Sequence, residues 1–579
     1  MTQDAAIPKI DIRPDHWRIV HAILQKHVPQ YAVWAFGSRA KWTAKEYSDL
    51  DLAIMTDKPL PLSVSADLSD DFSESDLPWK VDIVDWATTS EAFRKVIERD
   101  KVVVKGTSFQ SAEQGKRDWG MASKKVADIA SRTAIGPFGS RMKSDAYTPS
   151  GVPVIRGTNL TGGKYFSGDW VFVSEQTADE LVNCCVQTND LVFPHRGSIG
   201  EVGLVPSDFP RYVMSSSLMM LSCDPSKADP NYVYYFFKSH LGRHELLKNS
   251  SQVGTPGIGQ PLSTLRGIEI PLPNLSKQVA IAKILGSLDN KIDTNHRSNQ
   301  TLETIAQAIF KSWFVDFDPV KAKIAAIEQG HDPLRAGMRV ISGKTDAELD
   351  QMPREPYDQL AATAALFPEE MQESEFGEIP KGWAIKTAES IAQIGIGKTP
   401  PRKEPQWFTE GAGDWPWVSI RDLGNVGVYQ QKTSEFLTAE AVSRFNVKVV
   451  PEKTVLLSFK LTIGRVAITD GPMVTNEAIA HFKLRDNSEI STEYLYLLLK
   501  QFDYSVLGST SSIANAVNSK TVREMTIIVP KKRISDRFTQ IVRPLFGEIK
   551  SLQTEAEAFE KMRNLLLPKL ISGEIEVSA

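Results

Sequence analysis

The stretch DLVFPHRGSIGEVGLV, at residues 190–205, recurs as TVLLSFKLTIGRVAIT at residues 454–469. The shared Ile–Gly dipeptides, Ile199–Gly200 and Ile463–Gly464, are 264 positions apart. Three further pairs of similar segments surround them in the same order: VPVIRGTNL with WPWVSIRDL, NYVYYFFK with EYLYLLLK, and GIEIPLP with MTIIVP. Because their separations differ by only a few positions, the chain contains a duplicated domain whose copies differ by small loop changes.

The paired segments also predict which positions correspond in the two copies. The matched positions are Arg156 with Arg421, Tyr232 with Tyr494, and Pro271 with Pro530. Short runs rich in Val, Ile and Leu, broken by Gly, Pro and Ser, predict strands, and NYVYYFFKSHLG predicts a helix. We expect the aromatic residues of that helix to pack in a core: Tyr232, Tyr234, Tyr235, Phe236 and Phe237. Two diverged copies of one domain favour binding to two related but different targets.

The composition is that of a globular protein with about three to five domains, since the chain has 579 residues, 41% of them hydrophobic. No apolar run approaches the roughly 20 residues that cross a bilayer, and MTQDAAIPKI does not read as a signal peptide. The three cysteines, Cys184, Cys185 and Cys223, lack metal-ligand spacing. We therefore expect a cytoplasmic protein with no membrane association and no structural zinc site.

The net charge of −4 is unevenly distributed along the chain. Residues 1–115 carry all of it, whereas residues 116–275 carry +2 and residues 376–533 carry +4. Such a mild positive excess attracts phosphates only weakly. Charge alone therefore does not decide whether the chain binds DNA.

Each copy is followed by a segment in which core-type positions alternate in steps of four and three, the spacing of a coiled-coil seam. The first seam contains Ile281, Leu285, Leu288, Ile292, Asn295, Asn299, Leu302, Ala306, Ile309 and Trp313. The second contains Phe538, Val542, Leu545, Ile549, Leu552, Ala556, Phe559, Arg563, Leu566 and Leu570. Packed antiparallel, these helices would hold the two copies at opposite ends of a rod. The alternative is that each helix only covers the core of its own domain.

Two polar residues of the first seam and one proline within the second helical segment have particular consequences. Asn295 and Asn299 should lower stability but restrict the register of the helices. Pro544 should kink the second helix, because proline lacks the backbone N–H that a helix interior requires. Between the first seam and the second copy, a Pro- and acid-rich connector is expected around residues 345–380.

Several segments resemble those of type I restriction–modification specificity (S) subunits. They are GPFGSRMKSDAYTPSGVPVIRGTNL, IPLPNLSKQVAIAKILGSLDNKI, IFKSWFVDFDPVKAK and SEFGEIPKGW, and the resemblance covers about residues 118–579. It implies a mixed α/β multidomain protein with two repeated α/β target-recognition domains separated by long antiparallel coiled-coil helices. The expected parts are a first recognition domain at 118–275, a first spacer helix and connector at 276–375, a second recognition domain at 376–531, and a second spacer helix at 532–579.

The resemblance also implies a function. Each recognition domain would read one half of a split double-stranded DNA target, with the spacing set by protein geometry. The helices would dock two methyltransferase (M) subunits, which bind S-adenosylmethionine and methylate adenine. Restriction (R) subunits, which translocate with ATP and cut DNA, would join that complex. The specificity region itself would do no chemistry.

Base readout requires polar side chains on loops that reach a groove edge. Candidates in the first copy are Ser140, Arg141, Arg156, Asn159, His195, Arg196 and Ser198. Candidates in the second copy are Arg402, Lys403, Arg421, Lys460 and Lys520. For any one of them, a solvated loop charge or a phosphate contact is the simpler alternative. The recurrence of Arg156 and Arg421 favours a shared structural or DNA-backbone-binding role, whereas HRGS at 195–198 and FKLT at 459–462 differ as base-reading residues should.

Residues 1–110 contain a different pattern. VWAFGSRA predicts a strand followed by Gly37–Ser38 at the start of a helix. SDLDLAI places Asp49 and Asp51 on one face of a strand, and Asp82 follows in KVDIVDW. Three carboxylates on adjacent strands can hold two Mg²⁺ ions about 4 Å apart, which clamp the phosphates of a nucleotide. The glycine would let the backbone approach a phosphate, and the serine would hydrogen-bond it.

This pattern resembles the minimal nucleotidyltransferase domains of the DNA polymerase β superfamily. The motif is met in order by Gly37, Ser38, Asp49, Asp51 and Asp82. The resemblance implies an α+β fold that binds Mg²⁺ and a nucleoside triphosphate, with the three aspartates as metal ligands. A domain that has lost turnover and kept a binding role, or a set of solvated charges at strand ends, stays open as an alternative. Asp85 is expected to be a surface charge.

Three functions are consistent with these observations. The first is the DNA-specificity subunit of a type I restriction–modification complex, carrying an appended nucleotidyltransferase-like domain. The second is a Mg²⁺-dependent nucleotidyltransferase that modifies a protein or RNA acceptor and uses the C-terminal region for targeting. The third is a structural adaptor whose repeats bind protein. The duplicated domains and their helices occupy about four-fifths of the chain, which favours the first.

Overall fold

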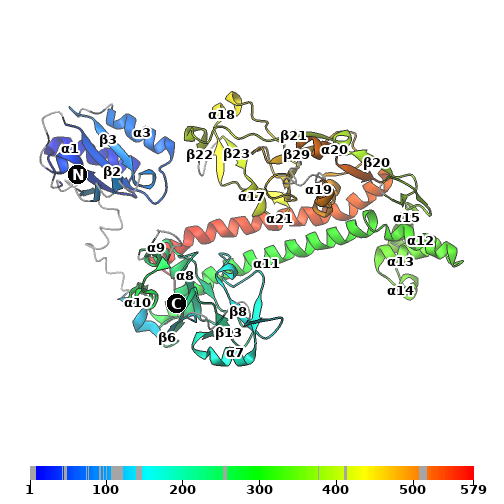
Figure 1. Cartoon of the computed structure of the whole chain (residues 1–579), viewed down its shortest axis with the longest axis horizontal. Coiled ribbons are helices and arrows are strands. Elements are labelled where there is room, and N and C mark those ends of the chain that lie inside the picture. The colour runs from blue at the N-terminus through cyan, green and yellow to red at the C-terminus, as the bar shows by residue number, and fades with distance from the viewer. Residues whose placement is uncertain are drawn as a thin grey trace. The chain divides into compact units, whose positions relative to one another are not determined.

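The computed structural model describes the chain apart from residues 1–7, 9, 42–43, 45–47, 74, 76, 90–92, 95–96, 99–100, 106–121, 138–141, 143–145, 249, 252–256, 376, 410–413, 508–517 and 579. It contains two compact units. Unit 1 comprises Met1–Arg117 and Leu302–Lys550, and unit 2 comprises Asp118–Thr301 and Ser551–Ala579. Figure 1 shows their helices and strands. Within the described residues, no helix combines the length and the apolar character that a membrane span needs.

The N-terminal domain is an α+β fold built on a four-stranded mixed sheet with strand order β3-β2-β1-β4. The strands are β1 (Ala32–Phe36), β2 (Leu50–Met55), β3 (Val81–Asp85) and β4 (Val102–Lys105). The helices are α1 (Pro14–His27), α2 (Gly37–Ala40) and α3 (Leu62–Ser73). Trp17 and Leu24 of α1 and Leu68 of α3 are buried in one apolar cluster with strand residues such as Leu52. Packing of both helices on the sheet therefore fixes the strand ends that carry the acidic motif.

The first recognition domain consists of two sheets in unit 2. One is antiparallel with order β12-β11-β14-β6, and the other is mixed with order β10-β13-β8-β9-β7. The strands are β5 (Ala122–Lys125), β6 (Ala130–Ile135), β7 (Tyr147–Thr148), β8 (Val152–Ile155), β9 (Val171–Val173), β10 (Cys185–Val186), β11 (Leu191–Pro194), β12 (Gly203–Leu204), β13 (Tyr212–Met214), β14 (Leu218–Cys223), β15 (Ser250–Ser251), β16 (Gly257–Ile258) and β17 (Glu269–Leu272). The helices are α6 (Val126–Ile129), α7 (Glu175–Glu180), α8 (Pro230–Lys238), α9 (His240–Leu247) and α10 (Pro261–Gly267). Pairing of β17 with β5 brings the two ends of the domain together.

The second recognition domain, in unit 1, repeats this plan. Its sheets have the orders β21-β29-β26-β27-β24 and β22-β25-β23-β28, and β20 pairs with β30 as β5 does with β17. The strands are β20 (Ala384–Thr387), β21 (Ala392–Ile396), β22 (Phe408–Thr409), β23 (Trp415–Val418), β24 (Tyr429–Gln430), β25 (Glu435–Leu437), β26 (Val455–Ser458), β27 (Val466–Thr469), β28 (Val474–Thr475), β29 (Ile479–Leu484) and β30 (Thr526–Val529). The helices are α16 (Ala388–Ile391), α17 (Ile420–Gly424), α18 (Ala439–Arg444), α19 (Thr492–Gln501) and α20 (Ser519–Glu524). The predicted duplication and fold class are confirmed.

The aromatic helix is confirmed as part of the core, but it is shorter than predicted. All five of its aromatic side chains are at most 2% exposed. The segment NYVYYFFKSHLG forms two helices rather than one, because Ser239 leaves the helical conformation and its Oγ caps α9 by accepting from Gly242 N. A Cβ at Gly242 would lie 2.2 Å from Phe236 O, so the glycine permits this tight junction.

One of the predicted correspondences is confirmed, and two are wrong. Tyr232 and Tyr494 are equivalent, since their hydroxyls donate to the carbonyls of Pro271 and Ile528 in the matching strands β17 and β30, at 2.7 and 3.0 Å. The same bonds show that Pro271 corresponds to Ile528, not to Pro530.

The mismatched arginines are explained by the turns that follow β8 and β23. Asn159 accepts from Arg156 N at 3.0 Å, and Asp422 accepts from Ser419 N at 2.9 Å. Asn159 and Asp422 are therefore equivalent capping residues, so Arg156 corresponds to Ser419 and Arg421 to Thr158. The two arginines therefore occupy positions two residues apart in the same turn.

The two long helices, α11 (Leu275–Phe314) and α21 (Lys532–Ile571), contain 40 residues each. In unit 2, Arg563 donates to Asp289 at 2.8 Å and Asn295 donates to Glu555 at 2.7 Å. In unit 1, the Phe314 ring lies 4.9 Å from the Phe538 ring. Later residues of α11 thus meet earlier residues of α21, so the helices are antiparallel. All the predicted seam positions are buried or half-buried, and α21 continues through Pro544.

These helices also belong to the recognition-domain cores. In unit 2, Ile281 and Leu285 of α11 and Leu570 of α21 lie in the same buried cluster as α8. In unit 1, Trp313 of α11 and Phe538 of α21 lie in the cluster that contains α19. The long helices therefore pack against each other, as the seam predicted, and also cover the cores of the recognition domains, as the alternative predicted.

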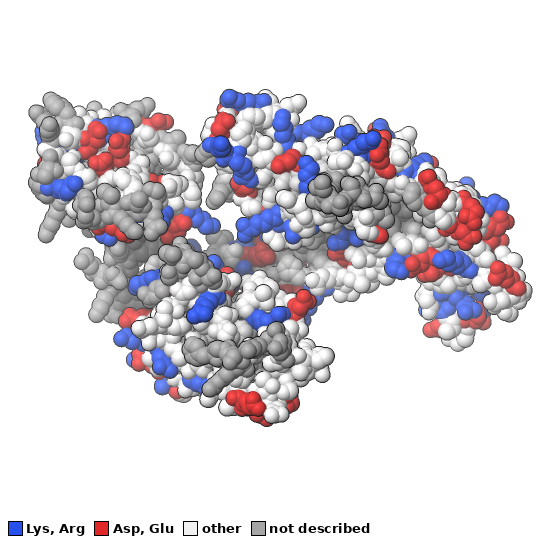
Figure 2. Space-filling view, in the orientation of Figure 1, with Lys and Arg blue, Asp and Glu red and all other residues white. Residues whose placement is uncertain are grey.

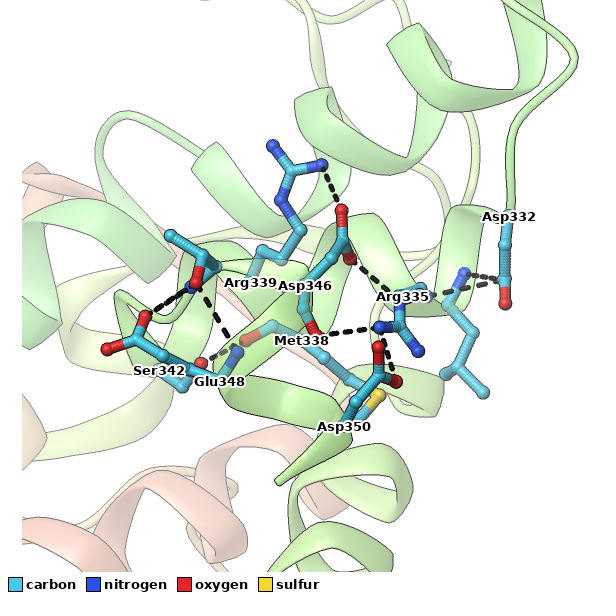
Figure 3. Close-up of polar contacts among 10 residues, drawn as sticks. Asp332, Arg335, Met338, Arg339, Ser342, Asp346, Glu348 and Asp350 are labelled. Atoms are coloured by element: carbon cyan, nitrogen blue, oxygen red, sulfur yellow. Dashed lines mark hydrogen bonds and ion pairs between the residues drawn. The ribbon is translucent and has the colours of Figure 1, made fainter. Parts of the chain in front are cut away.

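The connector between α11 and the second recognition domain is largely helical, which its proline content did not suggest. It contains α12 (Asp318–Glu328), α13 (Pro333–Ser342), α14 (Asp346–Asp350) and α15 (Arg354–Ala365), followed by β18 (Met371–Gln372) and β19 (Ile379–Pro380). Pro319 and Pro333 lie in the first turns of helices, where the missing N–H costs nothing. Arg335 of α13 pairs with Asp346 and Asp350 of α14, each at 2.7 Å (Figure 3).

A buried tyrosine fastens each recognition domain to α11. Tyr235 donates to Asp289 at 2.6 Å in unit 2, and Tyr496 donates to Glu303 at 2.7 Å in unit 1. Burial, together with the nearby Asp289 charge, raises the pKa of Tyr235, so its hydroxyl stays protonated and acts as the donor. Each bond joins a neutral donor to a carboxylate and is stronger than a neutral pair.

Tyr235→Phe should therefore loosen the contact between α8 and α11. A buried hydrogen bond to a charged acceptor contributes about 1.5–3 kcal/mol, and its loss should speed amide hydrogen exchange in both helices. Exchange measured by mass spectrometry would report this. Tyr212→Phe is the matched control, because the Tyr212 hydroxyl is buried without a hydrogen-bond partner among the described residues. Equal exchange in the two variants would show that the Tyr235 bond is unimportant.

Candidate functional site

The sheet of the N-terminal domain brings the acidic motif together. Asp51 on β2 pairs with Asp82 on the parallel strand β3 and with Phe36 on the antiparallel strand β1. Asp49 lies directly before β2 and is exposed, whereas Asp51 is half-buried. Gly37 begins α2 immediately after β1, and Ser38 follows in the same turn. The five predicted residues thus lie at one edge of one sheet.

Gly37 is required by the position of Asp51. Its φ is +74°, in the left-handed region that favours glycine. A Cβ at this position would lie 2.1 Å from Asp51 Oδ2, a distance that a carbon atom cannot occupy. The glycine thus allows the backbone of the β1–α2 turn to approach the carboxylate, in addition to the approach to a phosphate that the sequence suggested.

The electrostatics of the three carboxylates favour a bound cation. Burial and the charges of Asp82 and Asp49 raise the pKa of Asp51. Lys80 Nζ lies 2.5 Å from Asp82 Oδ1 and neutralises part of this charge. No three His, Cys, Asp or Glu side chains converge on a metal-sized space in the described part of the chain. Carboxylate oxygens are the ligands that Mg²⁺ prefers, so the chemistry of the donor set fits this ion.

Two supporting residues were not predicted. Arg39 is buried directly after the Gly–Ser pair, and its guanidinium donates to Ser48 O and Asp11 O at 2.8 Å each. It therefore braces the chain just before Asp49. Asp85, predicted as a surface charge, is partly buried and accepts from the backbone N–H of Leu60 and Ala87. It shapes the end of β3, so the surface-charge prediction was wrong.

Four of the predicted DNA-binding residues are held by contacts within the chain. Asn159 is 1% exposed and donates to Ser167 O and Asp169 O, and Arg156 also donates to Asp169 O. His195 is 4% exposed, and burial lowers its pKa, which favours the neutral ring. Arg402 makes two bonds to Glu435 and lies 4.1 Å from the Phe408 ring centre. Asn159 and His195 are therefore too buried to read a base, whereas the Arg402 side chain is 50% exposed although it is paired with Glu435.

The remaining described candidates are exposed: Arg196, Ser198, Lys403, Arg421, Lys460 and Lys520. Lys520 lies 3.7 Å from Glu524 on the same helix. Ser140 and Arg141 lie outside the described residues. On the face seen in Figure 2, positive and negative side chains are interspersed over most of the described surface. Charge is therefore not concentrated into one basic stripe on this face.

The loops after β11 and β26 share one backbone conformation. Gly197 and Leu461 have φ values of 82° and 62°, and Gly200 and Gly464 have 95° and 88°. Both pairs are separated by 264 positions, the spacing of the original sequence repeat. The HRGS and FKLT segments thus occupy equivalent places on one scaffold and present different side chains.

Two sequence families match separate parts of the chain. The family described as type I restriction modification DNA specificity domain matches residues 124–304 and 380–558. The family described as polymerase beta, nucleotidyltransferase matches residues 19–110. The first family covers both recognition domains and most of each long helix, and the second covers the acidic site.

Individual relatives likewise match either the large C-terminal region or the N-terminal domain. The HindI specificity subunit of Haemophilus influenzae is 32% identical over 408 residues, which cover 67% of this chain and 87% of that protein. The MjaIX specificity subunit of Methanocaldococcus jannaschii is 26% identical over 485 residues, or 81% of this chain and 97% of that protein. The probable protein adenylyltransferase MntA of H. influenzae is 55% identical over 96 residues, or 17% of this chain and 84% of that protein. A crystal structure of the S subunit from M. genitalium aligns at 16% identity with a TM-score of 0.45, covering 80% of this chain and 98% of that one.

The approach of Gly37 to Asp51 can be tested by Gly37→Ala. The added methyl group must displace the carboxylate, so binding of Mg²⁺–ATP, measured by titration calorimetry on the full chain, should weaken at least about tenfold. Gly330→Ala is the matched control, because Gly330 has a φ of +72° and meets no described heavy atom within 4 Å. Equal binding by both variants would contradict the assigned role of Gly37.

Proposed function

Because the chain belongs to the type I restriction–modification DNA specificity family, we propose that each of its two recognition domains reads one half of a split double-stranded DNA target. One observation carries this proposal: the recognition domain is duplicated, and each copy shares its core with both long helices. Such paired helices suit a protein that must read two short sequences in a defined order. The equivalent loops 195–200 and 459–464 present different side chains, as two different half-sites require.

The long helices are proposed to dock two methyltransferase subunits, with restriction subunits joining the complex. Large apolar side chains remain exposed on both helices: Val279, Ile284, Ile305, Met562 and Leu565. Exposed apolar surface of this kind favours protein contacts. In this proposal S-adenosylmethionine and ATP are bound by the partner subunits, and the complex acts on DNA in the cytoplasm.

Exchange of residues 119–273 for the corresponding domain of a relative tests the assignment of one domain to each half-site. The chimera, co-expressed with the partner methyltransferase, should methylate a split motif in which only one half has changed. Sequencing of methylated adenines in the host genome would give both motifs. A change in both halves would contradict the proposal, and absence of methylation with the unmodified chain would contradict the specificity function itself.

For the N-terminal domain we propose transfer of a nucleoside monophosphate from a nucleoside triphosphate to an acceptor on a partner protein, in which the α–β phosphoanhydride bond breaks and pyrophosphate leaves. The identity with MntA, whose name describes a probable protein adenylyltransferase, and the arrangement of Gly37, Asp49, Asp51 and Asp82 support it. Asp49 and Asp51 would hold Mg²⁺, which supplies charge neutralisation for the phosphates when bound. Gly37 and Ser38 would bind a phosphate at the β1–α2 turn. An RNA acceptor is the alternative.

Transfer can be measured by incubating the full chain with cell lysate, Mg²⁺ and ATP labelled at the α-phosphate. A labelled protein band is expected with wild type and lost with Asp49→Ala or Asp51→Asn, since each removes a proposed metal ligand. Asp67→Ala, at an exposed position on α3, should keep the activity. Label from γ-labelled ATP instead would indicate phosphorylation, and label confined to RNA would indicate the alternative acceptor. Equal labelling by wild type and Asp49→Ala would contradict catalysis at this site.

A further inference from the structure

The loop 459–464 of the second recognition domain carries an apolar side chain where its counterpart carries none. Leu461 has a φ of 62°, and the equivalent residue of the first domain is Gly197. A non-glycine residue in the left-handed region costs about 1–2 kcal/mol, because its Cβ approaches the following carbonyl. The fold therefore retains a leucine at a position where glycine would be more stable.

Leu461 gains nothing from burial in return. Its side chain is 94% exposed, the largest value among the exposed large hydrophobic residues described, ahead of Leu565 at 67%. Burial of a leucine contributes about 1.5–3 kcal/mol, none of which is realised here. Both the strain and the exposure argue that the residue is kept for contact with another molecule.

The loop holds this leucine in a defined position. Ser458, which is fully buried, donates from Oγ to Thr462 O at 2.6 Å and accepts from Arg465 N at 3.0 Å. Gly464 N donates to Ser458 O at 3.0 Å. These bonds close the loop on both sides of Leu461, so its side chain is presented from a fixed backbone and loses little freedom on binding.

The surroundings of Leu461 suit DNA. Lys460, next to it, is exposed and can reach a phosphate, and the equivalent loop of the first domain exposes Arg196 and Ser198. Apolar side chains contact thymine methyl groups in the major groove, and they can also enter between base steps. We propose that Leu461 makes an apolar base contact within the half-site read by the second recognition domain. This inference rests on the proposed DNA-reading function and adds a specificity-determining residue that only one domain possesses.

Leu461→Gly is the informative variant, because it removes the side chain and relieves the backbone strain, so the fold should not suffer. In the complex with the methyltransferase partner, affinity for the wild-type target should fall at least about fivefold by fluorescence anisotropy. For a target whose second half-site is scrambled, Leu461→Gly and the wild-type protein should have the same affinity. Leu461→Met, which keeps an apolar side chain of similar reach, should retain most of the wild-type affinity for the target.

Ile327→Ala is the control for loss of an exposed apolar side chain elsewhere, because Ile327 of α12 is 47% exposed and has no part in the proposed docking surface, and it should leave DNA affinity unchanged. The proposal would be overturned if Leu461→Gly bound the target as tightly as wild type, or lost affinity equally for the scrambled target. Weaker assembly with the methyltransferase in Leu461→Gly would also overturn it, by indicating a protein contact. If the wild-type complex shows no split motif at all, the proposed function fails, whereas an intact motif with unchanged Leu461→Gly affinity rejects only the present inference.

Discussion

The organisation of the chain depends on the burial of apolar side chains along α11 and α21. Each helix contributes to the cores of both recognition domains, so neither domain is complete without residues that lie far away in the sequence. Apolar burial is not directional and would tolerate several registers. The buried polar contacts restrict it: Asp289 with Arg563 and Asn295 with Glu555 leave uncompensated groups if the helices slide. Register therefore comes from a few polar residues, and stability comes from the apolar ones.

The two copies fasten their domains to α11 by the same device built from different residues. Tyr235 uses Asp289 in one copy, and Tyr496 uses Glu303 in the other. By the spacing of the repeat, Tyr496 corresponds to Tyr234 and not to Tyr235. The helix that carries the tyrosine is thus equivalent while the residue that forms the bond has moved by one position. The two copies therefore both bond a tyrosine to a carboxylate of α11, although the residues that form the bond are not equivalent in sequence.

The sequence was most informative where a period or a fixed order carried the signal. Every position predicted by the four-three spacing is buried or half-buried, and the order of Gly37, Asp49, Asp51 and Asp82 predicted residues that the sheet places along one edge. Prediction from the sequence failed where a single hydrogen bond determined the local structure. The pairing of Arg156 with Arg421 could not be rejected without the caps formed by Asn159 and Asp422. Likewise, the chain between α11 and the second recognition domain is largely helical, with Pro319 and Pro333 in the first turns of helices, and Asp85 is a backbone acceptor because β3 ends beside Leu60.

The equivalent loops show how such a protein can change its target without changing its fold. Gly200 and Gly464 keep the same left-handed conformation, and the position three residues earlier keeps it too, even though one copy has Gly197 and the other Leu461. In the second copy the loop is closed by Gly464 N, which donates to Ser458 O, and by Arg465 N, which donates to the Ser458 hydroxyl. Because both loops leave the buried strands β11 and β26, exposed side chains such as Arg196 and Lys460 carry little structural cost. Substitutions there alter what is presented to a groove while the core stays intact, so recognition can diverge faster than the fold.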